Sequence, residues 1–223
     1  MSKRYKNVTV VAEKPVAVDS PDHICPVGAK NDNSTHVGYI NEVVAYLENE
    51  GLGHNVMDIG CAGGQLAVDL SHRGYFSVGI EGSSYPVKAG RDNWKEYYQT
   101  ILHTADATKP FHVEKNGDKV LFDLISAWEV VEHIHPTDLD AFFDNVLSNL
   151  QPNGIFVASI NMSEDVRVLP DGTKIYLHQS VFPKEKWLNE ILADRNVVAY
   201  PFRNSVRSGP SSFHIGMKRK DNE

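Results

Sequence analysis

Short apolar runs alternate with helix-like stretches along the chain from residue 55 to residue 160. Five of these runs are typical of buried strands, at 56–59, 76–80, 101–104, 122–127 and 155–160. The stretches between them place apolar residues three and four positions apart, as one face of a helix requires. Strands that are apolar throughout and alternate with helices predict a parallel sheet covered on both faces. The expected fold is therefore a doubly wound α/β domain.

The same periodicity places the helices and two later strands. Helices are expected at 35–50, 65–73, 86–98, 137–150 and 183–193, and further strands near 197–200 and 213–218. Ser34 or Thr35 would cap the first helix, and Gly51 and Gly53 would end it. The four residues Gln151–Gly154 are typical of a turn.

The two ends of the expected domain differ from its centre. Residues 1–33 show weak periodicity and several prolines, which predicts an extended arm with a short strand at Val8–Val11. Its last part, around 24–36, could fold over a cleft as a lid. Residues 34–220 would then form a single domain, with a polar insertion near 161–180 where substrate recognition is expected.

Composition narrows the function classes. The chain has 223 residues, of which 41% are hydrophobic, and a net charge of −7 from 22 Lys and Arg against 29 Asp and Glu. This balance excludes wholesale disorder and argues against nucleic-acid binding in general. No apolar run approaches the length of a membrane helix, and no signal-peptide core follows the basic N-terminus. Two cysteines make no disulfide framework, so a cytoplasmic protein is expected, with its oligomeric state open.

Candidate cofactor-binding residues follow three successive strands. The first strand leads into the small-residue loop Asp58–Gly64, the second ends in Glu81, and the third leads into Asp106 and Ala107. Doubly wound sheets bind ligands at the carboxyl ends of their strands. A loop of small residues permits close backbone approach, and a carboxylate after the second strand can accept hydrogen bonds from ribose hydroxyls. These positions together predict a nucleoside cofactor.

The loop distinguishes between cofactor classes. A dinucleotide fingerprint needs glycines where this chain has Ala62 and Gln65. The strand-end segments, with 122–133 and 147–154, instead resemble motifs of class I S-adenosylmethionine-dependent methyltransferases over residues 35–218. The resemblance implies S-adenosyl-L-methionine as cofactor. It also implies a Rossmann-like, mostly parallel sheet of seven strands with an antiparallel last strand.

Roles for individual residues follow from this resemblance. Gly60, Ala62 and Gly63 would line the methionine end of the cofactor, and Asp58 would orient their loop. Glu81 would bind the ribose. The side chain of Asp106 and the N–H of Ala107 would hold the adenine. Trp128 would form a pocket wall or stack on the sulfonium.

A second group of polar residues follows the fourth strand, at the expected acceptor end. If the chain turns into a helix there, Glu129, Glu132 and His133 share one face and can bind a divalent metal such as Mg²⁺. Ubiquinone-pathway O-methyltransferases and small-RNA terminal 2′-O-methyltransferases look similar here, and the RNA enzymes add a later histidine, comparable to His178. A metal would lower the pKa of an acceptor hydroxyl. Without a metal, His133, His135 or His178 could act as the general base.

The acceptor itself is open between several classes. A small hydroxylated metabolite such as a sugar is favoured by the acidity of the chain. An RNA 2′-O- or protein methyltransferase is the alternative, supported by the later histidine and by a C-terminal segment, 195–220, that contains Arg and Lys but no Asp or Glu. That segment could attract a phosphorylated acceptor or simply form a solvated basic face. A non-catalytic cofactor-binding protein is the third class.

Overall fold

The computed structural model describes residues 3–30, 35–206 and 211–219. Its main sheet has seven strands in the order β11-β12-β8-β7-β2-β3-β4. Their bounds are β2 Asn55–Ile59, β3 Phe76–Glu81, β4 Leu102–Thr104, β7 Phe122–Trp128, β8 Leu150–Asn161, β11 Asn196–Val198 and β12 Ser212–Lys218. The last strand, β12, is antiparallel to both of its neighbours, whereas all the other pairs are parallel. The expected seven-stranded, doubly wound sheet is confirmed.

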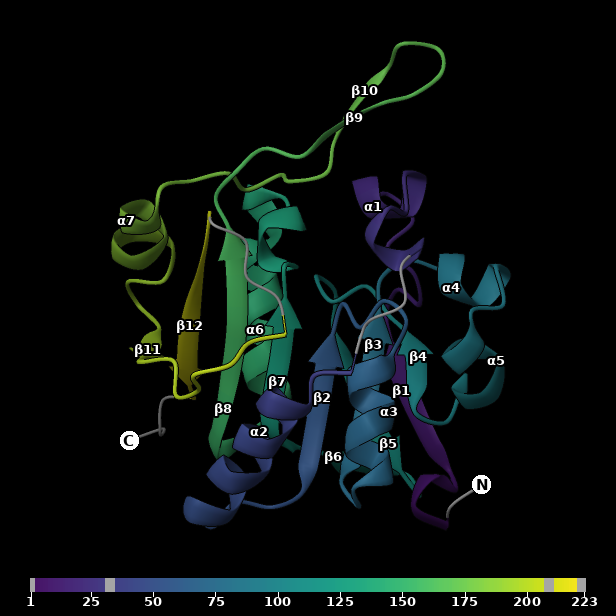
Figure 1. Cartoon of the computed structure of the whole chain (residues 1–223), viewed down its shortest axis with the longest axis vertical. Helices are drawn as coiled ribbons and strands as arrows, with labels where there is room; N and C mark the ends of the chain where they lie inside the picture. The colour runs from purple at the N-terminus through teal and green to yellow at the C-terminus, as the bar shows by residue number, and fades with distance from the viewer. Residues whose placement is uncertain (1–2, 31–34, 207–210, 220–223) are drawn as a thin grey trace.

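Alternate strand residues contribute to two apolar cores, one on each face of the sheet. Val56 packs with the helix α2 (Val37–Asn49), and its neighbour Met57 packs with α6 (Leu139–Asn149) on the opposite face. The helix α3 (Gln65–His72) lies against β2 and β3. Figure 1 shows α2 and α3 in front of the sheet and α6 behind it. The sheet is therefore buried on both sides, which explains why its strands are apolar runs.

The strand order reverses between β2 and β7. From β2 the chain moves outward through β3 to β4, and it then returns to the other side of β2 for β7 and β8. The carboxyl ends of these five parallel strands meet at one edge of the sheet. Such a switch point is where ligands bind in this class of fold.

The N-terminal segment packs on the domain. The predicted strand is present as β1 (Val8–Ala12), which pairs with β5 (Phe111–Lys115) in a small antiparallel sheet completed by β6 (Asp118–Val120). The arm then forms a short helix, α1 (Pro21–Ile24), and a 3₁₀ turn at Gly28–Lys30. Figure 1 places α1 beyond the arrowheads of β2 and β3, on the side of the carboxyl edge.

Several predicted elements differ from the observed ones. The helix expected at 86–98 is two helices, α4 (Tyr85–Lys88) and α5 (Asp92–Tyr97), because Gly90 has a φ of +58° and Arg91 is extended. The predicted turn Gln151–Gly154 is a bulge inside β8. The register there passes from the pair Phe122 and Leu150 directly to Leu124 and Ile155.

The ends of other helices also differ. His36 precedes α2 in place of the expected cap Thr35, and the other candidate cap, Ser34, lies outside the described residues. A 3₁₀ turn at Pro136–Asp138 precedes α6. The helix expected at 183–193 is one turn, α7 (Lys184–Lys186), followed by a π-helical turn at Trp187–Ile191. None of the described helices is long and apolar enough to cross a bilayer.

The polar insertion contains a hairpin that was not expected from the sequence. Its strands are β9 (Val166–Val168) and β10 (Lys174–Tyr176), which pair only with each other. In Figure 1 this hairpin projects beyond the carboxyl edge of the sheet, above the rest of the molecule. The N–H of Leu177 donates to the carbonyl of Asp165 at 2.8 Å, and this bond closes the base of the hairpin.

Candidate active site

One cavity of about 820 Å³ lies at the carboxyl edge of the parallel strands. The loops that follow β2, β3, β4 and β7 line it, and the N-terminal arm and residues 161–179 also contribute to its wall. Its volume is in the range of sites that enclose small molecules and cofactors. The cavity thus brings together candidate cofactor-binding and acceptor residues from several strand ends, whereas Gly63 and Glu132 are not part of its described lining.

The loop after β2 is held in an unusual backbone conformation. Gly60 and Ala62 both have positive φ, +70° and +47°. A Cβ on Gly60 would lie 2.3 Å from Cγ2 of Val130, so no larger residue fits without rearrangement. Trp94 Nε1 donates to the carbonyl of Ala62 at 2.7 Å, and Nδ2 of Asn93 donates to the carbonyl of the buried Gly63. Helix α5 therefore fixes this loop, with Gly60 and Ala62 lining the cavity.

Glu81 occupies the end of β3 as expected, but its carboxylate also has a structural role. The N–H groups of Ala62 and Ser83 each donate to one of its oxygens at 2.9 Å. Burial raises the pKa of Glu81, and these two backbone hydrogen bonds oppose that rise. A carboxylate oxygen accepts more than one hydrogen bond, so both oxygens keep capacity for ligand hydroxyls.

Asp106 and Ala107 lie at the next strand end along the edge. Oδ1 of Asp106 accepts hydrogen bonds from the N–H and the hydroxyl of Thr108, at 3.0 and 2.6 Å. The carbonyl of Ala107 accepts from Asn145, whereas its N–H has no hydrogen-bond partner among the described residues. Both residues line the cavity, and this free N–H can serve a ligand acceptor.

Asp58 and Trp128 line the cavity where β2 and β7 end. Ser126 Oγ donates to Asp58 Oδ1 at 2.7 Å, so this carboxyl group binds the neighbouring strand rather than the glycine loop. Burial raises its pKa to about 7 despite that bond. Trp128 packs edge-on against Tyr39 at 4.9 Å between ring centroids, and only 7% of it is exposed. The structure therefore places Trp128 as a wall of the cavity.

At the acceptor end, three candidate residues form a cluster. One ligand atom each from Glu132, His133 and His178 lies within 4.8 Å of the other two. Glu132 is completely buried, and neither of its carboxylate oxygens has a hydrogen-bond partner among the described residues. Its burial raises the pKa to about 8. The two buried carboxylate oxygens without hydrogen-bond partners lie beside two imidazoles. Such a set of oxygen and nitrogen atoms can serve as ligands of a divalent metal.

Backbone hydrogen bonds bring His178 to this cluster from a distant part of the chain. The N–H groups of Gln179 and Ser180 both donate to the carbonyl of Glu132, at 2.7 and 2.9 Å. The hydroxyl of Ser180 also donates to the carbonyl of Ile134 at 2.7 Å. The end of the insertion is thereby fixed against the turn that follows β7, and the rings of His133 and His178 lie 4.7 Å apart.

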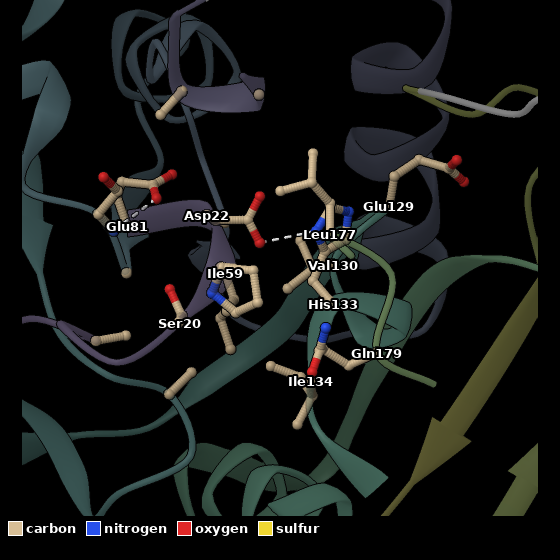
Figure 2. Close-up of a pocket in the computed structure, with 18 of the residues that line it drawn as sticks. Ser20, Asp22, Ile59, Glu81, Glu129, Val130, His133, Ile134, Leu177 and Gln179 are labelled. Atoms are coloured by element: carbon tan, nitrogen blue, oxygen red, sulfur yellow. Dashed lines mark hydrogen bonds and ion pairs between the residues drawn. The ribbon is translucent and has the colours of Figure 1, made fainter. Parts of the chain in front are cut away.

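Two sequence-predicted site residues occupy other places. Glu129 lies outside the cluster, because residues 129–133 form a left-handed position at Glu129 (φ +54°) and then a 3₁₀ turn, not a regular helix. Its carboxylate accepts from Asn161 at 2.9 Å and points away from His133 in Figure 2. His135 is exposed and caps its own turn through Thr137. The structure brings His178 to the cluster in place of Glu129.

Asp22 also lines the cavity, and no pattern in the sequence pointed to it. Its Oδ2 lies 2.7 Å from Nδ1 of His133, and Figure 2 shows this contact as a dashed line. The contact links the N-terminal arm to the turn after β7. Burial alone would lower the pKa of His133, but the hydrogen bond and charge of Asp22, together with the charges of Glu132 and Asp165, outweigh it and raise that pKa. No motif indicated this contact, because the two residues are 111 positions apart.

Comparisons with known proteins agree with this geometry. The sequence profile of a family described as "Methyltransferase domain" matches residues 35–196. A ubiquinone biosynthesis O-methyltransferase from a Chelativorans species is 34% identical over 110 residues, which cover 49% of this chain and 41% of that protein. The protein of the same description from Rickettsia typhi is 26% identical over 184 residues, which cover 74% of this chain and 68% of that protein.

Solved structures show the same fold at low sequence identity. An S-adenosylmethionine-dependent methyltransferase from Clostridium acetobutylicum superposes with a TM-score of 0.59 at 12% identity, covering 84% of this chain and 93% of that one. A glycopeptide N-methyltransferase in complex with S-adenosyl-L-homocysteine gives 0.53 at 14% identity, with coverages of 85% and 88%. The chain therefore belongs to the methyltransferase-domain family, and its sheet is that of the class I S-adenosylmethionine-dependent methyltransferases.

Proposed function

We propose that this protein transfers the methyl group of S-adenosylmethionine to a hydroxyl oxygen of a small molecule. The observation that carries the proposal is the cavity at the switch point. One part of the cavity is lined by Glu81, Asp106 and the Gly60 loop. Another part is lined by His133 and His178, the two histidines of the acceptor cluster Glu132, His133 and His178. A nucleoside and a hydroxyl group can therefore be held in one enclosure.

The residues present fit the cofactor. Gly60 packs against Val130 with no room for a side chain, and it lines the cavity together with Ala62. Glu81 retains acceptor capacity for two ribose hydroxyls, and the N–H of Ala107 is free for an adenine nitrogen. When bound, S-adenosylmethionine supplies an electrophilic methyl group on a sulfonium. Trp128 and the other apolar wall residues exclude water from this region.

The cluster of Glu132, His133 and His178 also fits a divalent metal. Its donors are one carboxylate and two imidazoles, a set that suits Mn²⁺, Fe²⁺ or Zn²⁺ better than the Mg²⁺ expected from two carboxylates. A cation there would polarise the acceptor hydroxyl and lower its pKa. This chemistry would use the buried oxygens of Glu132, which have no other partner among the described residues.

Proton removal can also proceed through the histidines alone. In that case the acceptor oxygen forms a bond to the methyl carbon as the carbon–sulfur bond breaks, and the hydroxyl proton passes to an imidazole nitrogen. His133 and His178 both line the cavity and are candidates for this base. His135 is a weaker candidate, because its Nδ1 accepts a hydrogen bond from the N–H of Thr137, which places the proton of the neutral ring on Nε2.

The charge of the cavity favours a neutral or cationic acceptor. Every Lys or Arg of the described lining is paired with an acid, in the pairs Lys14–Asp19, Lys109–Asp138 and Arg167–Asp165. Six lining acids, by contrast, have no Lys or Arg partner within the described residues: Asp22, Asp58, Glu81, Asp106, Glu129 and Glu164. A phosphorylated or carboxylated acceptor would find no free cation in this part of the chain.

The basic C-terminal segment does not supply the missing cations. Arg195 binds Asp140 and Asp144, outside the cavity, at 2.8 and 3.0 Å. Arg203, Lys218 and Arg219 do not line the cavity either. Arg207 and Lys220 lie outside the described residues. The described structure therefore supports a small hydroxylated metabolite over RNA, the second candidate.

The curated relatives support oxygen as the acceptor atom. Both relatives compared above carry the description ubiquinone biosynthesis O-methyltransferase. The matched region covers 41% of one and 68% of the other, so their substrate is not transferred to this chain. The glycopeptide enzyme among the structural neighbours acts on nitrogen, which keeps an amine acceptor as the alternative.

Calorimetry with S-adenosylmethionine tests the cofactor assignment. We expect Glu81→Ala to weaken binding by about 100-fold, because two charge-assisted hydrogen bonds to the ribose are lost. Glu164→Gln changes another acid of the same cavity and should bind like the wild type. Circular dichroism on both variants establishes that they fold. Equal affinity of Glu81→Ala and the wild type would contradict the assignment.

A further inference from the structure

The N-terminal helix places an acid against the acceptor cluster. Asp22 lies on α1, whereas His133 follows β7, and their Oδ2 and Nδ1 atoms are 2.7 Å apart. Both side chains are largely covered, with 29% of Asp22 and 19% of His133 exposed. The close approach joins the arm to the turn that carries two residues of the cluster.

Backbone hydrogen bonds fix the position from which Asp22 reaches His133. The N–H of Ala17 donates to the carbonyl of Gly82, and the N–H of Asp106 donates to the carbonyl of Lys14, both at 2.9 Å. These bonds attach the arm to the loops after β3 and β4. The hydroxyl of Ser20 then caps α1, so Asp22 lies in the first turn of a helix whose start is fixed.

The contact determines which nitrogen of His133 is available. A neutral imidazole carries one proton, and the nitrogen that holds it is set by its hydrogen-bond partner. The carboxylate of Asp22 accepts a hydrogen bond from Nδ1–H, which leaves Nε2 with the free lone pair that a metal ligand or general base needs. A carboxylate behind a histidine also restricts rotation of the ring.

We propose that Asp22 is a positioning residue that holds His133 in its Nδ1–H form, with Nε2 available to the acceptor site. The role of Nε2 as metal ligand or general base rests on the proposed function, whereas the effect of Asp22 on the tautomer of His133 does not. It makes the N-terminal arm part of the active site, in addition to its expected role as a cover. A site assembled from two distant segments would be complete only with the arm in place.

The experiment compares Asp22→Ala and Asp22→Asn with Asp19→Asn. Asp19 lies on the same segment but is exposed and pairs only loosely with Lys14, at 3.4 Å, so it controls for a general change of charge. The imidazole nitrogens of ¹⁵N-histidine-labelled protein are observed by NMR. The signal of His133 is identified by its loss in His133→Gln. Calorimetry then gives the affinity of each variant for Mn²⁺ alone.

We expect the wild type and Asp19→Asn to show His133 protonated at Nδ1. Asp22→Ala should lose this preference and bind Mn²⁺ about 10- to 100-fold more weakly, as expected when the partner behind a histidine ligand is removed. Asp22→Asn should recover part of both properties, because its amide oxygen still accepts from Nδ1–H. A purely structural attachment of the arm would not produce this recovery.

The opposite results would overturn the proposal. An unchanged His133 signal in Asp22→Ala, or equal changes in Asp22→Ala and Asp19→Asn, would exclude a specific positioning role. S-adenosylmethionine binding by the same samples separates this failure from that of the proposed function. If the wild type does not bind the cofactor, the function is wrong whatever the tautomer of His133. If the variants bind it normally, any change at His133 is local.

Discussion

Asp58 is a buried carboxyl group with a direct effect on stability. Burial raises its pKa to about 7, which is above the value of about 3.9 in an unfolded chain. A raised pKa means that Asp58 stabilises the fold at low pH and that this stability is lost as the pH rises through 7. Asp58→Asn resembles the neutral form at every pH. Relative to this variant, the wild type should lose about 2–3 kcal/mol of unfolding free energy between pH 5 and pH 8.

Urea denaturation of both proteins at several pH values measures this difference. Glu164→Gln, which removes an exposed acid, should have the pH profile of the wild type. Subtracting the Asp58→Asn profile removes the contributions of Glu81 and Glu132, whose pKa values are also raised by burial. Parallel profiles for the wild type and Asp58→Asn would show that the folded pKa of Asp58 is not raised.

Individual site residues differ in how well the sequence predicts them. Glu81 and Asp106 were predictable, because each follows a buried strand, and parallel strands end at a common edge. Glu129 lies outside the cluster in which it was expected, since its spacing to Glu132 implies proximity only in a helix, and the chain is not helical there. Asp22 could not be predicted, because its partner His133 is distant in the sequence and no local pattern links them.

Secondary structure elements also differ in how well the sequence predicts them. The five central strands were predictable because both of their faces are buried, which leaves long apolar runs. The strands β5 and β6 were missed because they are short and partly exposed, so their apolar pattern is weak. The break between α4 and α5 depends on the backbone angles of Gly90 and Arg91, and a single glycine in a helical pattern does not specify such a break.

The β9–β10 hairpin should be removable without loss of the fold. Its strands pair only with each other, and residues 170–174 at its tip are exposed. Replacing residues 168–174 by Asn-Gly would join the paired positions Arg167 and Ile175 with a two-residue turn. We expect the unfolding free energy to change by less than about 0.5 kcal/mol, as for other surface changes.

A matched substitution at the base of the hairpin provides the contrast. Leu177 is only 1% exposed, and Leu177→Ala should cost about 2–5 kcal/mol through the cavity that it leaves. Thermal unfolding of both variants and of the wild type gives the comparison. A shortened hairpin that destabilises the protein as much as Leu177→Ala would show that the hairpin packs on the domain. Normal S-adenosylmethionine affinity in the shortened variant would place the hairpin outside the cofactor site.

At the scale of the whole molecule, the distribution of charge separates the two candidate acceptors. The net charge of −7 opposes binding to a polyanion, although a local basic patch could overcome it. Inside the cavity, each described Lys or Arg of the lining is already paired with an acid. Phosphate contacts need free cations, and each contact adds to the salt dependence of binding. We therefore expect no salt-dependent binding of RNA.

Fluorescence anisotropy with a labelled single-stranded RNA of about 20 nucleotides, at 50 and 200 mM salt, tests this expectation. A protein making six phosphate contacts to a single strand would lose about 300-fold in affinity over this range, whereas we expect no measurable binding at either salt concentration. Asp138→Asn provides a sensitive control, because it releases Lys109 from its ion pair and adds one free cation to the cavity wall. Weak RNA binding by this variant alone would show that pairing of Lys109 with Asp138 prevents the wild-type cavity from binding phosphate groups. Strong, salt-dependent binding by the wild type would instead mean that cations outside the cavity lining engage RNA, and it would favour the nucleic-acid acceptor.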